Sequence, residues 1–344
     1  MFPSDSLFTE PHKGSIPAPE GSTLAQPYKY VVISPVKDEA AYIEQTICSM
    51  IAQTIQPSAW VIVNDGSRDA TESIIQKYSQ ENNWIRLVNR QDTGIRKRGK
   101  GVVEAFYTGY KTLTDVPYPT DALYPNANST ASSPEPYNSG VLSRFIVKLD
   151  GDVSFGPDYF ETLLNRFHAD PKLGIAGGGL YEKPDGKTWT LYTVKDHVRG
   201  CTKIYRRECF EEIGGLVASM GWDGIDEWKA LAKGWKVESF LEPKIYHYRF
   251  TGAATGFLKS CIEQGNGAYR MGYHPLFMIA RGIRRMTDRP FLIGGAAMIG
   301  AYFIAWYQKQ ELLAEPSVVS YIRQSQMKML TGLISGKPIH EGWR

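Results

Sequence analysis

The sequence has few cysteines, little net charge and no apolar run near its start. Its four cysteines, Cys48, Cys201, Cys209 and Cys261, include no CxxC pair and no spacing typical of zinc ligands, so a disulfide framework and a zinc site are not expected. The first 27 residues contain five prolines and lack the apolar core of a secretory signal. We therefore expect a cytoplasmic protein with reduced thiols and a flexible tail over residues 1–27.

The charges nearly balance. The chain has 39 Lys and Arg residues against 36 Asp and Glu residues, a net charge of +3. A nucleic-acid-binding protein needs a concentrated basic surface, so this balance argues against a nucleic-acid partner. Hydrophobic residues make up 42% of the 344 positions and charged residues 22%, which is typical of a globular protein with a large core.

From Tyr28 onward, strand-like and helix-like segments alternate. Apolar segments rich in β-branched residues predict strands, and a helical pattern follows each of them. These predicted strands cover residues 28–34, 60–65, 84–89 and 144–150. The alternation predicts an α/β fold with a mostly parallel central sheet and helices on both faces. A stretch at 115–140 with five prolines predicts a long loop insertion.

Acidic side chains follow three of the predicted strands where each strand ends. They are Glu39, Asp65, and the pair Asp150 and Asp152. The carboxyl ends of parallel strands meet at one edge of a sheet, which is where ligands bind in such folds. In the sequence Asp-Gly-Asp, both carboxylates point to roughly the same side and offer the hard oxygen ligands that Mg²⁺ and Mn²⁺ prefer. The sequence therefore predicts a site for Mn²⁺ or Mg²⁺ that also binds substrate phosphates.

Five segments occur in an order and spacing that resemble the family 2 glycosyltransferases. They are VVISPVKDEAAYIEQTICSMIAQT, VIVNDGSRDAT, RGKGVVEAFYTGY, FIVKLDGDV and GWDGIDEWKALAKGWKV. The resemblance covers about residues 28–250. It implies an inverting enzyme of the GT-A fold that transfers a sugar from a nucleotide-diphospho sugar, with UDP as the expected nucleotide, to a hydroxyl acceptor. On this basis we expect a GT-A domain over residues 28–254 and a helical C-terminal region over residues 255–344.

The resemblance also implies roles for individual residues. Pro35, Glu39 and Asp65 would surround the base and ribose, with Asn64 as the alternative to Asp65, because the family often has two acids where this chain has Asn64-Asp65. Asp150 would lie near the ribose and the metal, and Asp152 would bind the metal. Lys100 could reach the diphosphate. His247, on a predicted strand after the base region, is a candidate third metal ligand.

The family's catalytic base lies about eleven residues before a glycine that follows a helix. Counting back from Gly234 gives Asp223, with Asp226 as the second candidate. A sugar hydroxyl is a weak nucleophile at neutral pH, so a carboxylate within hydrogen-bond reach must accept its proton during attack.

The last part of the chain has a different character. Arg281, Arg284, Arg285 and Arg289 precede an uncharged run of 19 residues, 290–308. A basic segment followed by an apolar one suits a helix on an anionic membrane surface, a buried helix of a soluble protein, or a short membrane-spanning helix. The tail is similar to that of bacterial exopolysaccharide-type members, which implies a peripheral contact with the inner face of the membrane and a saccharide or lipid-linked acceptor.

Two other functions remain open at this point. A sugar nucleotidyltransferase also binds nucleotides on an α/β sheet, but the glycine-rich basic loop expected after VVIS is missing. A non-catalytic carbohydrate-binding relative would have kept the fold and lost the chemistry. The DxD sequence and Asp223 count against that alternative.

Overall fold

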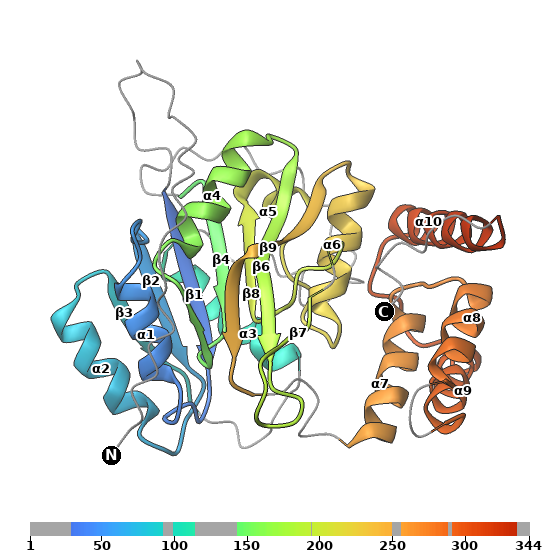
Figure 1. Cartoon of the computed structure of the whole chain (residues 1–344), viewed down its shortest axis with the longest axis horizontal. Coiled ribbons are helices and arrows are strands. Elements are labelled where there is room, and N and C mark those ends of the chain that lie inside the picture. Colours follow the sequence, from blue (N-terminus) through green and yellow to red (C-terminus); the bar gives the residue numbers. More distant parts are fainter. Residues whose placement is uncertain are drawn as a thin grey trace.

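We describe the protein from a computed structural model, in which the described residues are 29–91, 99–113, 143–193, 195–249, 256–287 and 291–335. The predicted tail at 1–27 and the predicted insertion at 115–140 lie outside them. Within the described residues, nine strands form one sheet in the order β3-β2-β1-β4-β8-β6-β9-β5, with β7 paired to β6 (Figure 1). The strands are β1 Tyr30–Val36, β2 Ala59–Asn64, β3 Ile85–Asn89, β4 Phe145–Leu149, β5 Val153–Phe155, β6 Leu173–Glu182, β7 Thr190–Leu191, β8 Thr202–Arg206 and β9 Lys236–His247.

The sheet has a parallel half and a mixed half. Strands β1 to β4 pair only in parallel among themselves, and β1 and β2 are joined by a helix that crosses over the sheet. Strand β8 is antiparallel to both of its neighbours, β4 and β6, and β5 is antiparallel to β9. The chain returns from β6 to β8 through the short strand β7 and not through a helix, which permits this reversal. The predicted α/β fold is confirmed, with the parallel pairing concentrated in β1 to β4.

Helices cover both faces of the sheet, as predicted. One face carries α1 Ile43–Ile51, α2 Thr71–Glu81 and α4 Tyr159–Ala169, and the other carries α3 Lys100–Lys111, α5 Arg207–Glu212 and α6 Trp222–Ala232 (Figure 1). Successive residues of each strand point to opposite faces. Val32 therefore belongs to the core under α1 and α4, and its neighbour Ile33 to the core under α3. This alternation buries both faces of the central strands.

Within the described residues, four further helices follow β9, so the predicted helical C-terminal extension is confirmed. They are α7 Phe257–Arg270, α8 Pro275–Arg285, α9 Ile293–Tyr307 and α10 Pro316–Ile334. Helices α7, α8 and α9 share a small core that includes Cys261, Met278 and Met298. Helix α10 packs on α6 through Ile322 and Ile225. None of the helices in the described part of the chain combines the length and the apolar content that a bilayer crossing needs.

Candidate active site

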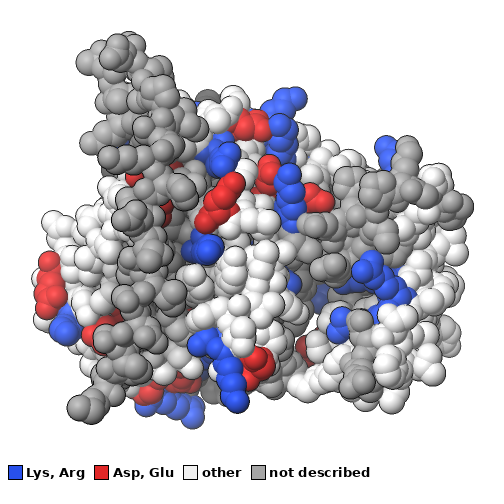
Figure 2. All heavy atoms as spheres, in the orientation of Figure 1, with Lys and Arg blue, Asp and Glu red and all other residues white. Residues whose placement is uncertain are grey.

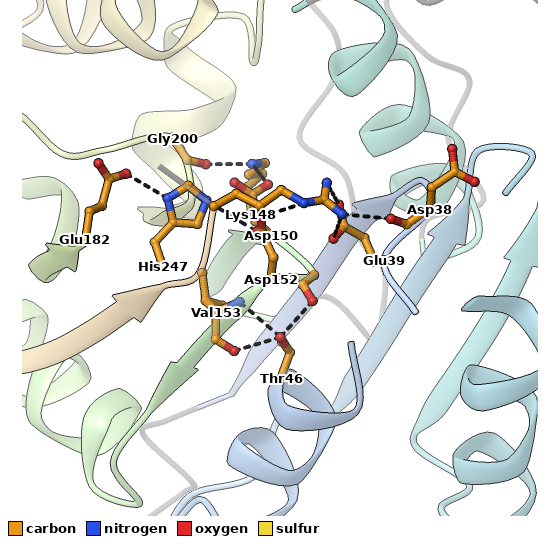
Figure 3. Close-up of polar contacts among 12 residues, drawn as sticks. Asp38, Glu39, Thr46, Lys148, Asp150, Asp152, Val153, Glu182, Gly200 and His247 are labelled. Atoms are coloured by element: carbon orange, nitrogen blue, oxygen red, sulfur yellow. Dashed lines mark hydrogen bonds and ion pairs between the residues drawn. The ribbon is translucent and has the colours of Figure 1, made fainter. Parts of the chain in front are cut away.

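The Asp-Gly-Asp turn lies between β4 and β5 and is anchored to α1. The hydroxyl of Thr46 accepts a hydrogen bond from the Val153 amide (3.1 Å) and lies 2.9 Å from the Gly151 carbonyl oxygen (Figure 3). A Cβ atom added to Gly151 would lie 2.7 Å from the side chain of Val36. Only glycine therefore allows this turn to approach β1 so closely. The turn is fixed at the carboxyl end of β1, as the sequence predicted.

Three potential metal ligands meet at this turn. Asp150, Asp152 and His247 each offer one ligand atom, and these atoms lie within 4.8 Å of one another. His247 comes from the end of β9, nearly 100 positions later in the sequence, because β9 pairs with β5 and sets His247 opposite Val153. The His247 Nε2 atom is 3.4 Å from an Asp152 carboxylate oxygen. The structure thus brings together the three residues for which the sequence predicted metal binding.

Glu182 orients the His247 ring. Its Oε1 atom lies 2.8 Å from His247 Nδ1, and Glu182 is completely buried at the end of β6 (Figure 3). A carboxylate on one ring nitrogen leaves the other nitrogen aimed at a metal position, an arrangement common in metal sites. Burial alone would lower the pKa of His247, but the hydrogen bonds with Asp152 and Glu182 outweigh it and raise the pKa to about 10. Sequence reasoning missed Glu182, since nothing around it in the sequence signals the contact.

Two cations offset the acidic edge. Lys148, buried in β4, donates a hydrogen bond to the Asp150 carboxylate and another to the Gly200 carbonyl oxygen (2.6 Å). Arg249 donates to Glu39 Oε1 and to the Asp38 carbonyl oxygen, both at 2.7 Å. The positive charges of Lys148 and Arg249 reduce the mutual repulsion among the carboxylates at this edge of the sheet. Sequence reasoning missed Lys148.

Glu39 is held at the end of β1. Its amide donates to the Thr71 hydroxyl (2.7 Å), and its side chain is buried. Burial and the nearby charge of Asp152 raise the pKa of Glu39 to about 8, although Arg249 acts in the opposite direction. Pro35, the residue before the last residue of β1, is half-buried and pairs with Val63 of β2.

Asn64 and Asp65, the two candidates for contact with the nucleotide, have different surroundings at the end of β2. Asn64 is buried, and its Oδ1 atom accepts a hydrogen bond from the Ser67 amide (3.0 Å), which shapes the turn. The Asp65 side chain keeps 30% of its surface exposed and accepts a hydrogen bond from Arg90 (2.7 Å). Asn64 therefore supports the turn, and Asp65 is the more exposed of the two side chains.

The two candidate bases lie on α6 but in different surroundings. Asp223 is in the first turn of α6 and is partly exposed. A Cβ atom built on Gly200 would be 3.1 Å from Asp223 Oδ2. Lys148 donates hydrogen bonds to both Gly200 and Asp150. Asp223 is therefore linked to the potential metal ligand Asp150 through Gly200 and Lys148.

Asp226 is completely buried. The Lys203 ammonium lies 3.0 Å from each of its carboxylate oxygens, and the Tyr205 hydroxyl donates to it as well. Burial raises the pKa of Asp226 to about 6, although the charge of Lys203 opposes this effect. Lys203 also donates to the main-chain carbonyl of Asp223 and pairs with Glu227 (2.9 Å). Asp226 thus helps to hold the first turn of α6, and of the two candidates Asp223 is the one accessible to a substrate.

We expect the variant Lys203→Met to lower the free energy of unfolding by about 3–5 kcal/mol, because it removes the cation that pairs with the buried Asp226 and leaves His197 as the ion-pair partner of Glu227. The matched control is Lys236→Met, which removes an ion pair with Asp170 (2.6 Å) at the surface, where the Lys236 side chain is 59% exposed. This control should lower the free energy of unfolding by at most about 1 kcal/mol. Urea unfolding followed by circular dichroism measures both. Equal losses in the two variants would show that the buried network has no special structural role.

Lys100 begins α3, close to the loop that precedes α6. A Cβ atom added to its neighbour Gly99 would lie 2.7 Å from the Ser219 carbonyl oxygen, so the start of α3 touches this loop. The φ angle of Gly99 is 65°, a conformation that favours glycine. The Lys100 ammonium is 3.9 Å from Glu104 on the same helix.

Comparison with protein families matches the segment that holds the first three strands, β1 to β3, to a known group. Residues 31–108 match the model of "Glycosyl transferase family 2". This range contains Glu39, Asn64, Asp65 and Lys100 but ends before the Asp-Gly-Asp turn.

Two curated relatives match a longer part of the chain. "Glycosyltransferase GlyA" of Streptococcus pneumoniae is 24% identical over 230 residues, which is 64% of this chain and 30% of the relative. "Putative glycosyltransferase EpsH" of Bacillus subtilis is 22% identical over 191 residues, 55% of this chain and 44% of the relative. The chain thus spans less than half the length of each.

A solved structure of S. aureus TarS, residues 1–349, in complex with UDP-GlcNAc is similar in outline. The TM-score is 0.47 at 13% sequence identity, over 92% of this chain and 89% of that structure.

Proposed function

Because the chain carries a family 2 glycosyltransferase domain, we propose that it transfers a sugar from a nucleotide-diphospho sugar to a hydroxyl group of an acceptor, with inversion at the anomeric carbon. The observation that carries the proposal is the convergence of Asp150, Asp152 and His247, next to the acidic ends of β1 and β2 and close to Asp223. Binding of a divalent cation, binding of a nucleotide and acceptance of a proton need groups of these kinds near one another.

The donor set fits a divalent cation. Two carboxylates and one imidazole are within reach of a common point, and Glu182 fixes the imidazole orientation. Oxygen ligands suit Mg²⁺ and Mn²⁺, and the imidazole nitrogen is a ligand that transition metals accept. Asp150, Asp152 and His247 would hold the ion. When bound, it would stabilise the negative charge on the diphosphate leaving group.

The residues at the strand ends support binding of the nucleotide. Asp65 has an exposed carboxylate edge for the base, with Glu39 and Pro35 on the adjacent strand, and Asp150 on the next strand is suited to the ribose. Arg249 and Lys100 are the cations that we assign to the diphosphate. UDP is the nucleotide that we expect, and the acceptor is a saccharide or a lipid-linked saccharide.

Asp223 supplies the base. It accepts the proton of the acceptor hydroxyl as the oxygen attacks the anomeric carbon and the bond to the diphosphate breaks. A single direct displacement inverts the configuration and needs no nucleophile from the protein. Lys148 positions Asp150 and Gly200 through its two hydrogen bonds, and the Asp223 side chain lies close to Gly200. A partly exposed carboxylate so near the metal ligands favours catalysis over carbohydrate binding alone.

A panel of nucleotide sugars tests this function. With Mn²⁺ and without acceptor, we expect slow hydrolysis of one donor to the free sugar and a nucleoside diphosphate, and no hydrolysis with EDTA. The variant Asp158→Asn, which alters an exposed carboxylate outside the site, serves as the control and should behave like the unchanged chain. In a parallel assay with added pyrophosphate, release of sugar 1-phosphate together with a nucleoside triphosphate would identify a nucleotidyltransferase. Failure to bind or cleave any donor would contradict catalysis.

A further inference from the structure

The C-terminal helices bring three helix ends together. A Cβ atom on Gly294 would lie 2.7 Å from the Phe257 ring, so α9 and α7 begin side by side. A Cβ atom on Gly295 would lie 2.2 Å from the Gly282 carbonyl oxygen, so the end of α8 lies there too. The Arg285 guanidinium is 5.6 Å from the Phe257 ring. The starts of α7 and α9 and the end of α8 therefore form one surface, which we call the α7–α9 tip (Figure 1).

The α7–α9 tip exposes large apolar side chains. Phe291, Leu292 and Ile293 are consecutive and 59%, 65% and 55% exposed. Others around them are Phe257, Leu258, Ile262 and Ile283, exposed between 37% and 57%. Leu292 has a φ angle of 65°, which is unfavourable for leucine, so the backbone holds this side chain outward at a cost. A contiguous apolar surface of this kind marks a contact with another phase or molecule.

Basic residues surround the same surface. Of the basic residues on these helices, Lys259, Arg284 and Arg285 lie at the helix ends that form the tip, whereas Arg270 lies at the opposite end of α7. Among the bases, Arg284 in the last turn of α8 is exposed and Lys259 is in the first turn of α7. In Figure 2, the part of the surface over α7–α9, at the lower right, is largely uncharged, with basic side chains near it. Positive charge around exposed apolar side chains complements an anionic lipid surface.

We propose that the α7–α9 tip inserts its apolar side chains into the surface of an anionic lipid bilayer. The contact is made by one end of the helical unit, because one face of α9 is packed on its neighbours along the helix. Met298 and Tyr302 are 1% exposed, and a Cβ atom on Gly265 of α7 would come within 2.2 Å of the Met298 carbonyl oxygen.

The short segment between Arg249 and the start of α7 limits how far the tip can lie from the active site. Only seven peptide units connect Arg249 to Gly256, which limits the distance between them to roughly 25 Å. The bilayer contact would therefore lie near the metal ligands. The inference does not depend on the proposed transfer reaction, since binding to vesicles and binding of a nucleotide are measured separately.

Co-sedimentation with vesicles tests the proposal. We expect the full chain to sediment at low salt with vesicles of phosphatidylcholine containing about one third phosphatidylglycerol, and much less with phosphatidylcholine alone. The double variant Phe291→Gln with Leu292→Asn should lower the partition coefficient at least about tenfold, since it removes two exposed apolar anchors. Asparagine tolerates the positive φ angle at position 292. Replacing Arg284 by glutamine should lower the vesicle partition coefficient about fivefold.

The matched control is Ile304→Gln with Trp306→Gln, at the other end of α9. These side chains are 57% and 60% exposed, close to those at the tip, but lie roughly 20 Å away along the helix. The control should sediment like the unchanged chain, and all variants should keep its thermal unfolding midpoint and its affinity for UDP with Mn²⁺.

Three results would overturn the proposal. They are failure of the unchanged chain to sediment with anionic vesicles, sedimentation of the tip variant as strong as that of the unchanged chain, and a loss of vesicle binding in the control variant as large as that in the tip variant. Analytical ultracentrifugation of the same samples supplies a further test. Dimers that the tip variant dissociates, without any vesicle binding, would show that a second copy of the chain covers this surface.

Discussion

Replacing Asp152 by asparagine is expected to abolish the gain in UDP affinity that Mn²⁺ provides. Asp152 is buried beside His247, and its carboxylate is one of the three potential ligands at the turn. Burial would raise its pKa, but the interactions with His247, Arg249 and Lys148 lower it, so the ionised form is the ligand. Asparagine has nearly the same shape without the charge. Because a bound cation contributes several kcal/mol at the leaving group, transfer should fall about a thousandfold.

Calorimetric titration of UDP with Mn²⁺ and with EDTA measures the effect directly. The control is again Asp158→Asn, whose exposed side chain makes no cap hydrogen bond to α4. This control should keep the difference in UDP affinity between the buffer with Mn²⁺ and the buffer with EDTA. If Asp152→Asn also kept the full difference, the metal would bind elsewhere.

Replacing Asp223 by asparagine is expected to leave donor binding intact and to reduce transfer by about 10²–10⁴-fold, the usual contribution of a general base. Asp223 is not one of the three clustered metal ligands, so the affinity for UDP with Mn²⁺ should change little. Steady-state rates with donor and acceptor, combined with calorimetry, separate these two effects.

Asp226→Asn provides the contrast on the same helix. This change affects a completely buried carboxylate paired with Lys203, so it should lower the unfolding midpoint while the folded fraction retains transfer. The reverse pattern, with active Asp223→Asn and a folded but inactive Asp226→Asn, would reassign the base.

The sequence predicted the parallel half of the fold well. The predicted strands at 28–34, 60–65 and 84–89 correspond to β1, β2 and β3 within about two residues at each end. Their apolar β-branched runs are local signals, and each is followed by a helical pattern. The carboxylates that follow β1 and β4 lie close enough for Glu39 to interact with Asp150 and Asp152, and β2, which precedes Asp65, pairs with β1 at the same edge.

The contacts that complete the site were not predictable in the same way. Glu182 meets His247 across 65 positions, and Arg249 meets Glu39 across 210. Both contacts depend on β9 pairing with β6 on one side and β5 on the other. A hydrophobic pattern identifies a strand but not its partner or its register. The three-dimensional arrangement was therefore needed to identify Glu182 as the partner of His247.

The two candidate bases show a similar limit. Asp223 and Asp226 are three residues apart on α6, which puts them near the same side of the helix. Spacing alone could not separate them. Their difference comes from Lys203 and Tyr205 of β8, which enclose Asp226 beneath the sheet and leave Asp223 at its edge.

A crystal of the protein grown with UDP and Mn²⁺, measured at the manganese absorption edge, tests most directly whether strand ends far apart in the sequence form one site for metal and nucleotide. We expect one strong anomalous peak bounded by Asp150, Asp152 and His247, with the diphosphate next to it and the uracil toward Asp65. A peak away from these residues, or UDP bound elsewhere on the molecule, would contradict the proposed site.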